Sequence, residues 1–418
     1  MKKKIFGSMV LAGMALTSAQ AVDVNFFGHI GAAYNQGLSA GNTQHTVDGK
    51  KATYAGVTGH VGMDLGFNAL HLGVGVYGAM PIYGTHIKYT PANNGGAGGG
   101  TNAPAIDDNQ ANIMYSKDYI DLSDLYLIYD NSNVTLAVGR FNNEFLGSEW
   151  LNSYMQGVAF RYQSKMFGFW TAWINDATTY GYAPNRIASE LMAYNRFPSS
   201  FNNFNLNNEV FAAGMKFDFD FLTFDPFVHY YLNKGFDDTI QAGANLALIF
   251  GQEGGPVQST TAIKFMWENT LGKASDDTMM LLGDEELIFG GVFKLGAGVF
   301  ATTGGDGIVT INDGTRFYGR RYLTPNFNYW SSAYFTPKNT TWYVFTGVKS
   351  TYFDLDILYA DGDYKEFSAI ASFTLFDTQS KGSLNGVSMK LGGGYVNNGF
   401  KTGAQQSSNV VAFAKLSF

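Results

Sequence analysis

Charged residues of opposite sign are concentrated around one short connection in the first half of the chain. Arg140 ends one alternating segment, Arg161 lies in the segment that follows, and Glu144 and Glu149 lie between them. Acids and bases that face each other across a narrow, poorly screened passage create a transverse field, which acts strongly on ions and dipolar solutes. We therefore expect Arg140, Glu144, Glu149 and Arg161 to set the narrowest point of such a passage. The alternative is a surface hairpin with ordinary ion pairs.

Other motifs for chemistry are weak. The glycine run at 95–100 has no strand-to-helix context and no closing Lys-Ser/Thr pair, so a surface loop is favoured over a phosphate-binding loop. The acidic stretch 361–366 lacks the twelve-residue calcium-loop pattern and favours a hairpin. His60 and His71 share a face of neighbouring segments, but polar contacts are favoured over a hydrolytic pair. We expect no enzyme activity, no cofactor and no metal site.

The first residues predict export. Three lysines, an apolar run and the small-residue site Ala19-Gln20-Ala21 form a secretory signal that would be cleaved after Ala21. The apolar run is too short for a transmembrane helix, which needs about 20 apolar residues. The predicted domains are therefore a signal peptide, residues 1–21, and one mature domain, residues 22–418.

The composition of the mature chain favours β-structure. Aromatic residues make up 16% of the sequence and glycine occurs 51 times, while cysteine is absent and no disulfide can form. Removal of three signal lysines leaves 24 basic and 34 acidic residues, a net charge of −10. This acidic excess argues against nucleic-acid binding, and in a channel it leans weakly toward cations.

Period-two alternation recurs from one end of the chain to the other. It is clearest at 54–66, 209–220 and 351–360, where apolar residues alternate with polar or small ones. We predict eighteen strands near 22–34, 54–66, 69–81, 118–129, 134–142, 155–163, 166–174, 209–220, 221–232, 239–250, 258–267, 285–293, 295–303, 340–349, 351–360, 364–376, 385–396 and 408–418.

The connections between these strands alternate between short and long. Tight turns are predicted at Asn68, 131–133, 164–165, Phe221 and Lys294, and long polar connections at 82–117, 175–208 and 304–339. A soluble sandwich has no reason to keep its long loops at one end. The pattern predicts an all-β fold, a single transmembrane antiparallel barrel with short periplasmic turns and long external loops.

The last strand carries an assembly feature. Val410, Ala412, Ala414 and Leu416 occupy every second position up to the terminal Phe418. A final aromatic after an alternating strand is typical of the signal that outer-membrane barrel assembly machinery binds, although an ordinary strand also ends in Phe by chance. We expect Phe418 to be that signal.

The strand parity also predicts which charged side chains face a wet lumen. The candidates are Lys216, Asp218, Asp225, Lys264, Asp354, Asp356 and Lys390. Strict alternation from Val134, Leu136 and Val138 directs Arg140 toward lipid. Arg140 reaches the lumen only if Gly139 forms a bulge or if Arg140 lies above the membrane.

A family resemblance arises at residues 134–164. The segment VTLAVGRFNNEFLGSEWLNSYMQGVAFRYQS resembles the corresponding part of OprD-like outer-membrane porins, through Gly139-Arg140 and Gln156-Gly157-Val158. The resemblance implies eighteen strands, a constriction loop and passage of amino acids, small carboxylates or other nutrients. Porins of that family often carry a basic ladder, which the seven arginines of this chain do not readily supply.

These observations together predict an integral protein of a Gram-negative outer membrane that allows passive diffusion of small hydrophilic solutes and ions, with a weak preference for cations. The alternative is a barrel that acts mainly as an adhesin or surface structure. Expected partners are outer-membrane lipid, the barrel assembly machinery and small hydrophilic solutes, and no nucleic acid. The sequence leaves a homotrimer open, because lipid-facing and partner-facing strands share an apolar composition.

Overall fold

The structure is a computed structural model, and its described residues cover the strands and the short turns. The described residues are 22–38, 53–89, 106–109, 119–151, 154–179, 195–196, 209–232, 237–272, 277–304, 308, 316–318, 338–378, 386–401 and 407–418. The predicted signal peptide, 1–21, lies outside them.

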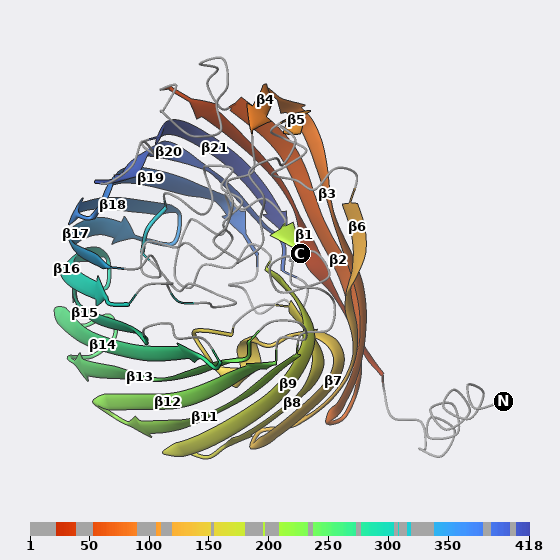
Figure 1. The fold of residues 1–418 in the computed structure, drawn as a ribbon. Coiled ribbons are helices and arrows are strands. Elements are labelled where there is room, and N and C mark those ends of the chain that lie inside the picture. Colours follow the sequence, from red (N-terminus) through yellow and green to blue (C-terminus); the bar gives the residue numbers. More distant parts are fainter. Residues whose placement is uncertain are drawn as a thin grey trace.

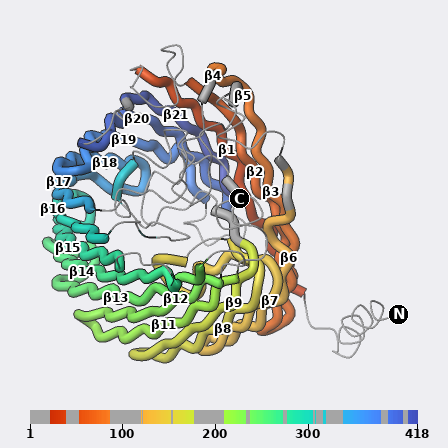
Figure 2. Tube along the Cα trace, in the orientation of Figure 1, coloured from red at the N-terminus to blue at the C-terminus, as the bar shows by residue number. Residues whose placement is uncertain are grey.

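Eighteen long strands form one closed antiparallel sheet (Figures 1 and 2). Each strand pairs with the next along the chain, and pairing of the first strand with the last closes the barrel. The wall consists of β1 (Asp23–Gly37), β2 (Thr53–Phe67), β3 (Leu70–Gly84), β6 (Tyr119–Asn131), β7 (Val134–Asn142), β8 (Tyr154–Gln163), β9 (Phe167–Thr179), β11 (Glu209–Phe219), β12 (Leu222–Leu232), β13 (Thr239–Phe250), β14 (Val257–Thr270), β15 (Thr278–Phe289), β16 (Phe293–Thr302), β17 (Asn339–Lys349), β18 (Phe353–Gly362), β19 (Tyr364–Asp377), β20 (Ser388–Phe400) and β21 (Ser407–Ser417).

Three further strands are short. β4 (His86–Tyr89) and β5 (Ile106–Asn109) form a separate two-stranded sheet, and β10 (Asn195–Arg196) pairs with the end of β9. Among the described residues, no helix has the length and apolar character needed to cross a membrane. The predicted all-β barrel of eighteen strands is confirmed.

The alternation of the sequence places apolar residues outside the barrel. On β14, Ile263 and Phe265 are 42% and 41% exposed, whereas their neighbours Lys264 and Met266 face the interior and Met266 is fully buried. A surface of large exposed apolar side chains is costly in water and favourable against lipid. The outer face therefore has the chemistry of a lipid-facing barrel.

The chain ends close the sheet. The backbone N–H of Phe418 donates to the carbonyl of Gly28 at 3.0 Å, and the N–H of Gly28 donates to the carbonyl of Phe418 at 2.9 Å. β21 itself pairs with β1 from His29–Ser417 to Gly37–Asn409. The terminal residue is thus the last rung of the closing seam.

Two details differ from the sequence predictions. The predicted turn at Lys294 is wrong, because Gly290, Gly291 and Val292 form the turn and Lys294 lies on β16. β15 also begins at Thr278, earlier than the predicted 285. Its inward residues Met280 and Leu282 are apolar and fully buried, so the first half of the strand has no polar face from which alternation could be recognised.

Candidate functional site in the barrel lumen

The connection between β7 and β8 folds into the barrel. After the short 3-10 helix Glu144–Leu146, Trp150 and Leu151 are completely buried. The indole Nε1 of Trp150 donates to Oδ1 of Asn245 on β13 at 3.2 Å, and its ring lies 6.4 Å from that of Phe227 on β12. β12 and β13 are several strands away from β8 along the wall. The connection therefore reaches through the lumen to another part of the wall.

An ion pair fixes the tip of this connection. Glu149 pairs with Lys264 of β14, and the Lys264 ammonium lies 5.7 Å from the centre of the Trp150 ring. Both charged side chains are largely shielded from solvent, at 21% and 18% exposed. A charge pair in such a confined place is screened less by salt than one at a wide mouth. The tip of the connection thus carries a charge pair that salt screens only weakly.

Arg161 holds the base of the same connection. It lies on β8, and its Nη1 donates to the backbone carbonyl of Phe145 at 2.6 Å. Nearby, Nδ2 of Asn143 donates to the carbonyl of Leu151, also at 2.6 Å. A side chain that satisfies a loop carbonyl orders the loop, because the buried carbonyl would otherwise lack a partner.

The Arg161→Gln substitution should loosen this connection without removing its Glu149–Lys264 pair. We expect larger fluctuations of the open-channel current, and a loss of stability of about 1.5–3 kcal/mol for a lost charge-assisted hydrogen bond. Open-channel noise in planar bilayers measures the first effect and thermal unfolding in detergent the second. If neither changes, Arg161 does not order the connection.

Arg140 occupies a different position from Arg161. It pairs across the sheet with Leu125 and lines a small pocket with Tyr154 and Met155, and the Tyr154 ring lies 5.3 Å from that of the buried His60 on β2. The ladders through Gly139 run without a register shift, although its φ of 113° is one that favours glycine. The bulge that would direct Arg140 to the lumen is therefore not present at Gly139.

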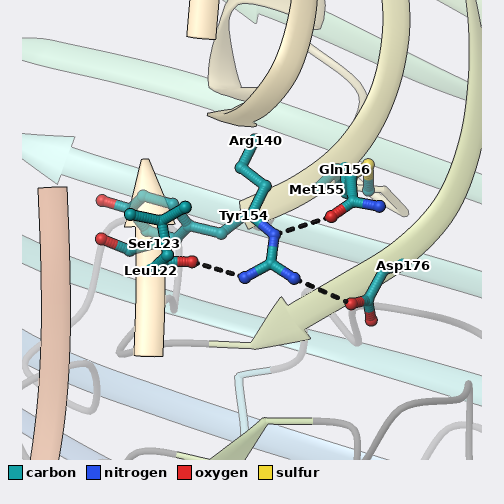
Figure 3. Close-up of a pocket in the computed structure, with 7 residues that line it drawn as sticks. All are labelled: Leu122, Ser123, Arg140, Tyr154, Met155, Gln156 and Asp176. Atoms are coloured by element: carbon teal, nitrogen blue, oxygen red, sulfur yellow. Dashed lines mark hydrogen bonds and ion pairs between the residues drawn. The ribbon is translucent and has the colours of Figure 1, made fainter. Parts of the chain in front are cut away.

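The guanidinium of Arg140 joins three strands (Figure 3). Its Nε donates to Oε1 of Gln156 at 2.7 Å, its Nη1 to the carbonyl of Leu122 at 2.7 Å, and its Nη2 lies 3.5 Å from Asp176. The β6–β7 ladder ends at Leu125, so the Leu122 carbonyl lies beyond the last β7 partner. The Arg140 side chain therefore donates to the Leu122 carbonyl in place of a β7 backbone N–H. A role for Arg140 in a constriction stays a prediction, and this structure gives it a role in joining the wall.

Glu144 is exposed at the start of the 3-10 helix, where its backbone N–H bonds Oδ1 of Asn142 at 3.1 Å. Of the four residues grouped from the sequence, Glu149 lies at the tip of the inward connection, and Arg161 of β8 bonds the backbone at its base. Glu144 lies on the exposed part of that connection.

The seven predicted lumen residues all lie on strand positions that alternate with outward ones. Lys264 meets the inward connection, Lys216 and Asp218 approach to 4.0 Å, and Asp356 pairs with Lys294. Lys390 is opposite Lys415 in the β20–β21 ladder. The remaining two, Asp225 and Asp354, each have one buried carboxylate oxygen without a hydrogen-bond partner among the described residues.

A second inward segment was not predicted from the sequence. Residues 316–318, between β16 and β17, lie against the interior of the wall, where Arg316 binds Asp284 and Glu286. Alternation on β15 places both acids on one face, which is a signal that could have marked them. Nothing in the sequence marks Arg316 as their partner, because a loop position has no strand parity.

His60 and His71, the two histidines considered from the sequence, contact separate carboxylates. Nε2 of His60 lies 2.7 Å from Asp124, and Nδ1 of His71 lies 2.9 Å from Asp64. Within the part of the chain that the structure describes, no three His, Asp or Glu residues are placed to share a metal ion.

The geometry defines a class: a closed barrel of eighteen antiparallel strands with charged inward residues and connections folded into its lumen. Comparison with solved structures finds the same fold in porins. OccAB4 of Acinetobacter baumannii superposes with a TM-score of 0.63 at 12% identity, over 95% of this chain and 98% of that one. OpdK of Pseudomonas aeruginosa, solved with vanillate, gives 0.62 at 11%, and a BenF-like porin of Pseudomonas fluorescens Pf-5 gives 0.62 at 14%, both over 95% and 98%.

No family model and no curated protein matches the chain. The structural comparison confirms the resemblance to OprD-like porins in the fold, over nearly the whole length of this chain and of each of the three solved porins.

Proposed function

We propose that this protein is an outer-membrane channel for passive diffusion of small hydrophilic solutes and ions. The observation that carries the proposal is the β7–β8 connection, which crosses the lumen of a closed eighteen-stranded barrel and pairs Glu149 with Lys264. A barrel of this size leaves an aqueous interior, and an inward connection narrows it. The porins that share the fold support the same function.

The proposal includes a weak preference for cations. Acids outnumber bases among the described strand residues that face the lumen. The acids include Asp64, Asp124, Asp218, Asp225, Glu268, Asp284, Glu286, Asp354, Asp356 and Glu366, and the bases include Arg161, Lys216, Lys264, Lys294, Lys390 and Lys415. Negative potential in a lumen raises the local concentration of cations and lowers that of anions.

The location and partners follow from the same proposal. Residues 1–21 direct export, Phe418 engages the barrel assembly machinery, and the apolar outer face contacts outer-membrane lipid. Part of that outer face is also available for contact between copies in a homotrimer.

Passage of solutes is testable with proteoliposomes. Vesicles that contain the purified protein should swell in small sugars and amino acids, at a rate that falls as solute size increases. Vesicles without protein are the control. Absence of swelling for the smallest solutes would contradict an open channel.

Neutralising both acids of the inward connection should change ion selectivity. The double variant Glu144→Gln, Glu149→Gln removes two negative charges near the proposed constriction, so cation preference should fall and the reversal potential in a KCl gradient should move toward zero. Glu253, exposed on the β13–β14 turn, is a matched control, and Glu253→Gln should leave the reversal potential unchanged. Equal behaviour of both variants would place selectivity elsewhere in the barrel.

A further inference from the structure

We propose that the lumen wall formed by β15 and β17 is a binding site for guanidinium groups, which Arg316 occupies as an intramolecular ligand. The inference rests on the proposed function, because a solute reaches this wall only through an open lumen. The solutes of this site are organic cations with a planar guanidinium group, which exchange with Arg316 during passage.

The contacts of Arg316 match the geometry of a guanidinium site. Nε and Nη2 donate to the two carboxylate oxygens of Asp284 at 2.8 and 2.5 Å, and Nη1 donates to Glu286 at 2.9 Å. The guanidinium carbon lies 4.0 Å from the centre of the Phe345 ring. Paired donors on one carboxylate plus a stacked aromatic face suit a planar cation and suit an ammonium poorly.

The wall supplies all of these recognition groups and holds them in place. Asp284 and Glu286 are two residues apart on β15 and so share one face, and Phe345 lies on β17. The hydroxyl of Tyr343 donates to Oδ2 of Asp284 at 2.5 Å, which fixes the carboxylate independently of Arg316. A carboxylate oriented by a second side chain is a preorganised acceptor.

The two residues after Arg316 are anchored by other contacts. The Phe317 ring lies 5.8, 5.3 and 5.2 Å from the rings of Phe300, Tyr343 and Tyr364. The Tyr318 hydroxyl donates to Asp356 at 2.6 Å, and its backbone N–H donates to Glu366 at 2.8 Å. Removal of the Arg316 side chain should therefore leave a vacant site between carboxylates, and the segment should stay docked.

The charge balance of the site favours exchange of Arg316 with a solute over a permanent ion pair with Asp284 and Glu286. Two carboxylates face one guanidinium, so the site attracts cations even when Arg316 is bound. Phe317 and Tyr318 hold the backbone in place, so exchange requires only that the Arg316 side chain rotate away from Asp284 and Glu286. A free guanidinium solute then competes with a side chain that is tethered beside the site, and the solute is released along the lumen.

The test uses chemical rescue of Arg316→Ala with methylguanidinium. In planar bilayers, methylguanidinium should block the Arg316→Ala channel at concentrations roughly tenfold lower than those that block the wild type, a difference of about 1.4 kcal/mol. Methylammonium at equal concentration, and Asp284→Asn added to Arg316→Ala, should each abolish the difference.

A second readout does not depend on conduction. Methylguanidinium should raise the thermal unfolding temperature of Arg316→Ala in detergent and leave that of the double variant unchanged. Conduction without any methylguanidinium effect on block or unfolding would overturn the guanidinium site and leave the channel function standing. A thermal shift without conduction would support the site and contradict the channel.

Discussion

Replacing Trp150 with alanine is expected to enlarge the pore more than any other single substitution in the inward connection. The side chain is completely buried, spans from the β7–β8 connection to Asn245 and Phe227, and lies beside the Glu149–Lys264 pair. Its loss removes the largest group that holds the connection across the lumen. Single-channel conductance should rise by about a factor of two, because a constriction limits the current.

Trp342→Ala is the matched control for this substitution. Trp342 lies on β17 and is 47% exposed on the outside of the barrel, so its removal deletes the same side chain without touching the lumen. Conductance of Trp342→Ala should equal that of the wild type. If Trp150→Ala also conducts like the wild type, the connection does not form the narrowest point.

Deletion of Phe418 is expected to lower the amount of folded barrel in the outer membrane severely, while synthesis and export continue. Two effects coincide at this residue. Its backbone makes two hydrogen bonds with Gly28 across the closing seam, each worth about 1 kcal/mol net. Its aromatic ring supplies the predicted assembly signal. Heat-dependent migration of outer-membrane fractions on gels measures the folded amount.

Two point variants separate these effects. Phe418→Ala keeps the backbone rung and removes the ring, whereas Phe418→Tyr keeps both. If the ring is the signal, Phe418→Ala should resemble the deletion and Phe418→Tyr the wild type. Wild-type levels of Phe418→Ala would assign the effect to barrel closure, and wild-type levels of the deletion itself would show that the residue is incidental.

The strands could be predicted from the sequence because lipid on one side and water on the other impose strict alternation. Phe211, Met215 and Phe219 mark the outside of β11 as clearly in the sequence as in the fold. The predicted start of β15 was wrong because the inward residues there do not contact water. On β15, Met280 and Leu282 face inward but are apolar and buried, so the two-sided pattern disappears.

The site was less predictable than the wall. Charges between β7 and β8 indicated an inward connection. Its partners Asn245 and Lys264 lie 95 and 115 residues further along the chain than Trp150 and Glu149, and no local pattern joins them. Arg140 shows a second limit. The period-two pattern alone directed it outward, whereas in the structure its guanidinium bonds the Leu122 carbonyl of β6 and lies beside Tyr154. Loop docking depends on long-range contacts that neither spacing nor composition encodes.

The most direct test of a water-filled channel is the current through the purified, refolded protein in a planar lipid bilayer under a KCl gradient. We expect discrete, ohmic conductance steps and a small reversal potential of the sign that indicates preference for K⁺ over Cl⁻. Folded protein that inserts but passes no current would contradict the channel and favour a surface or adhesive role.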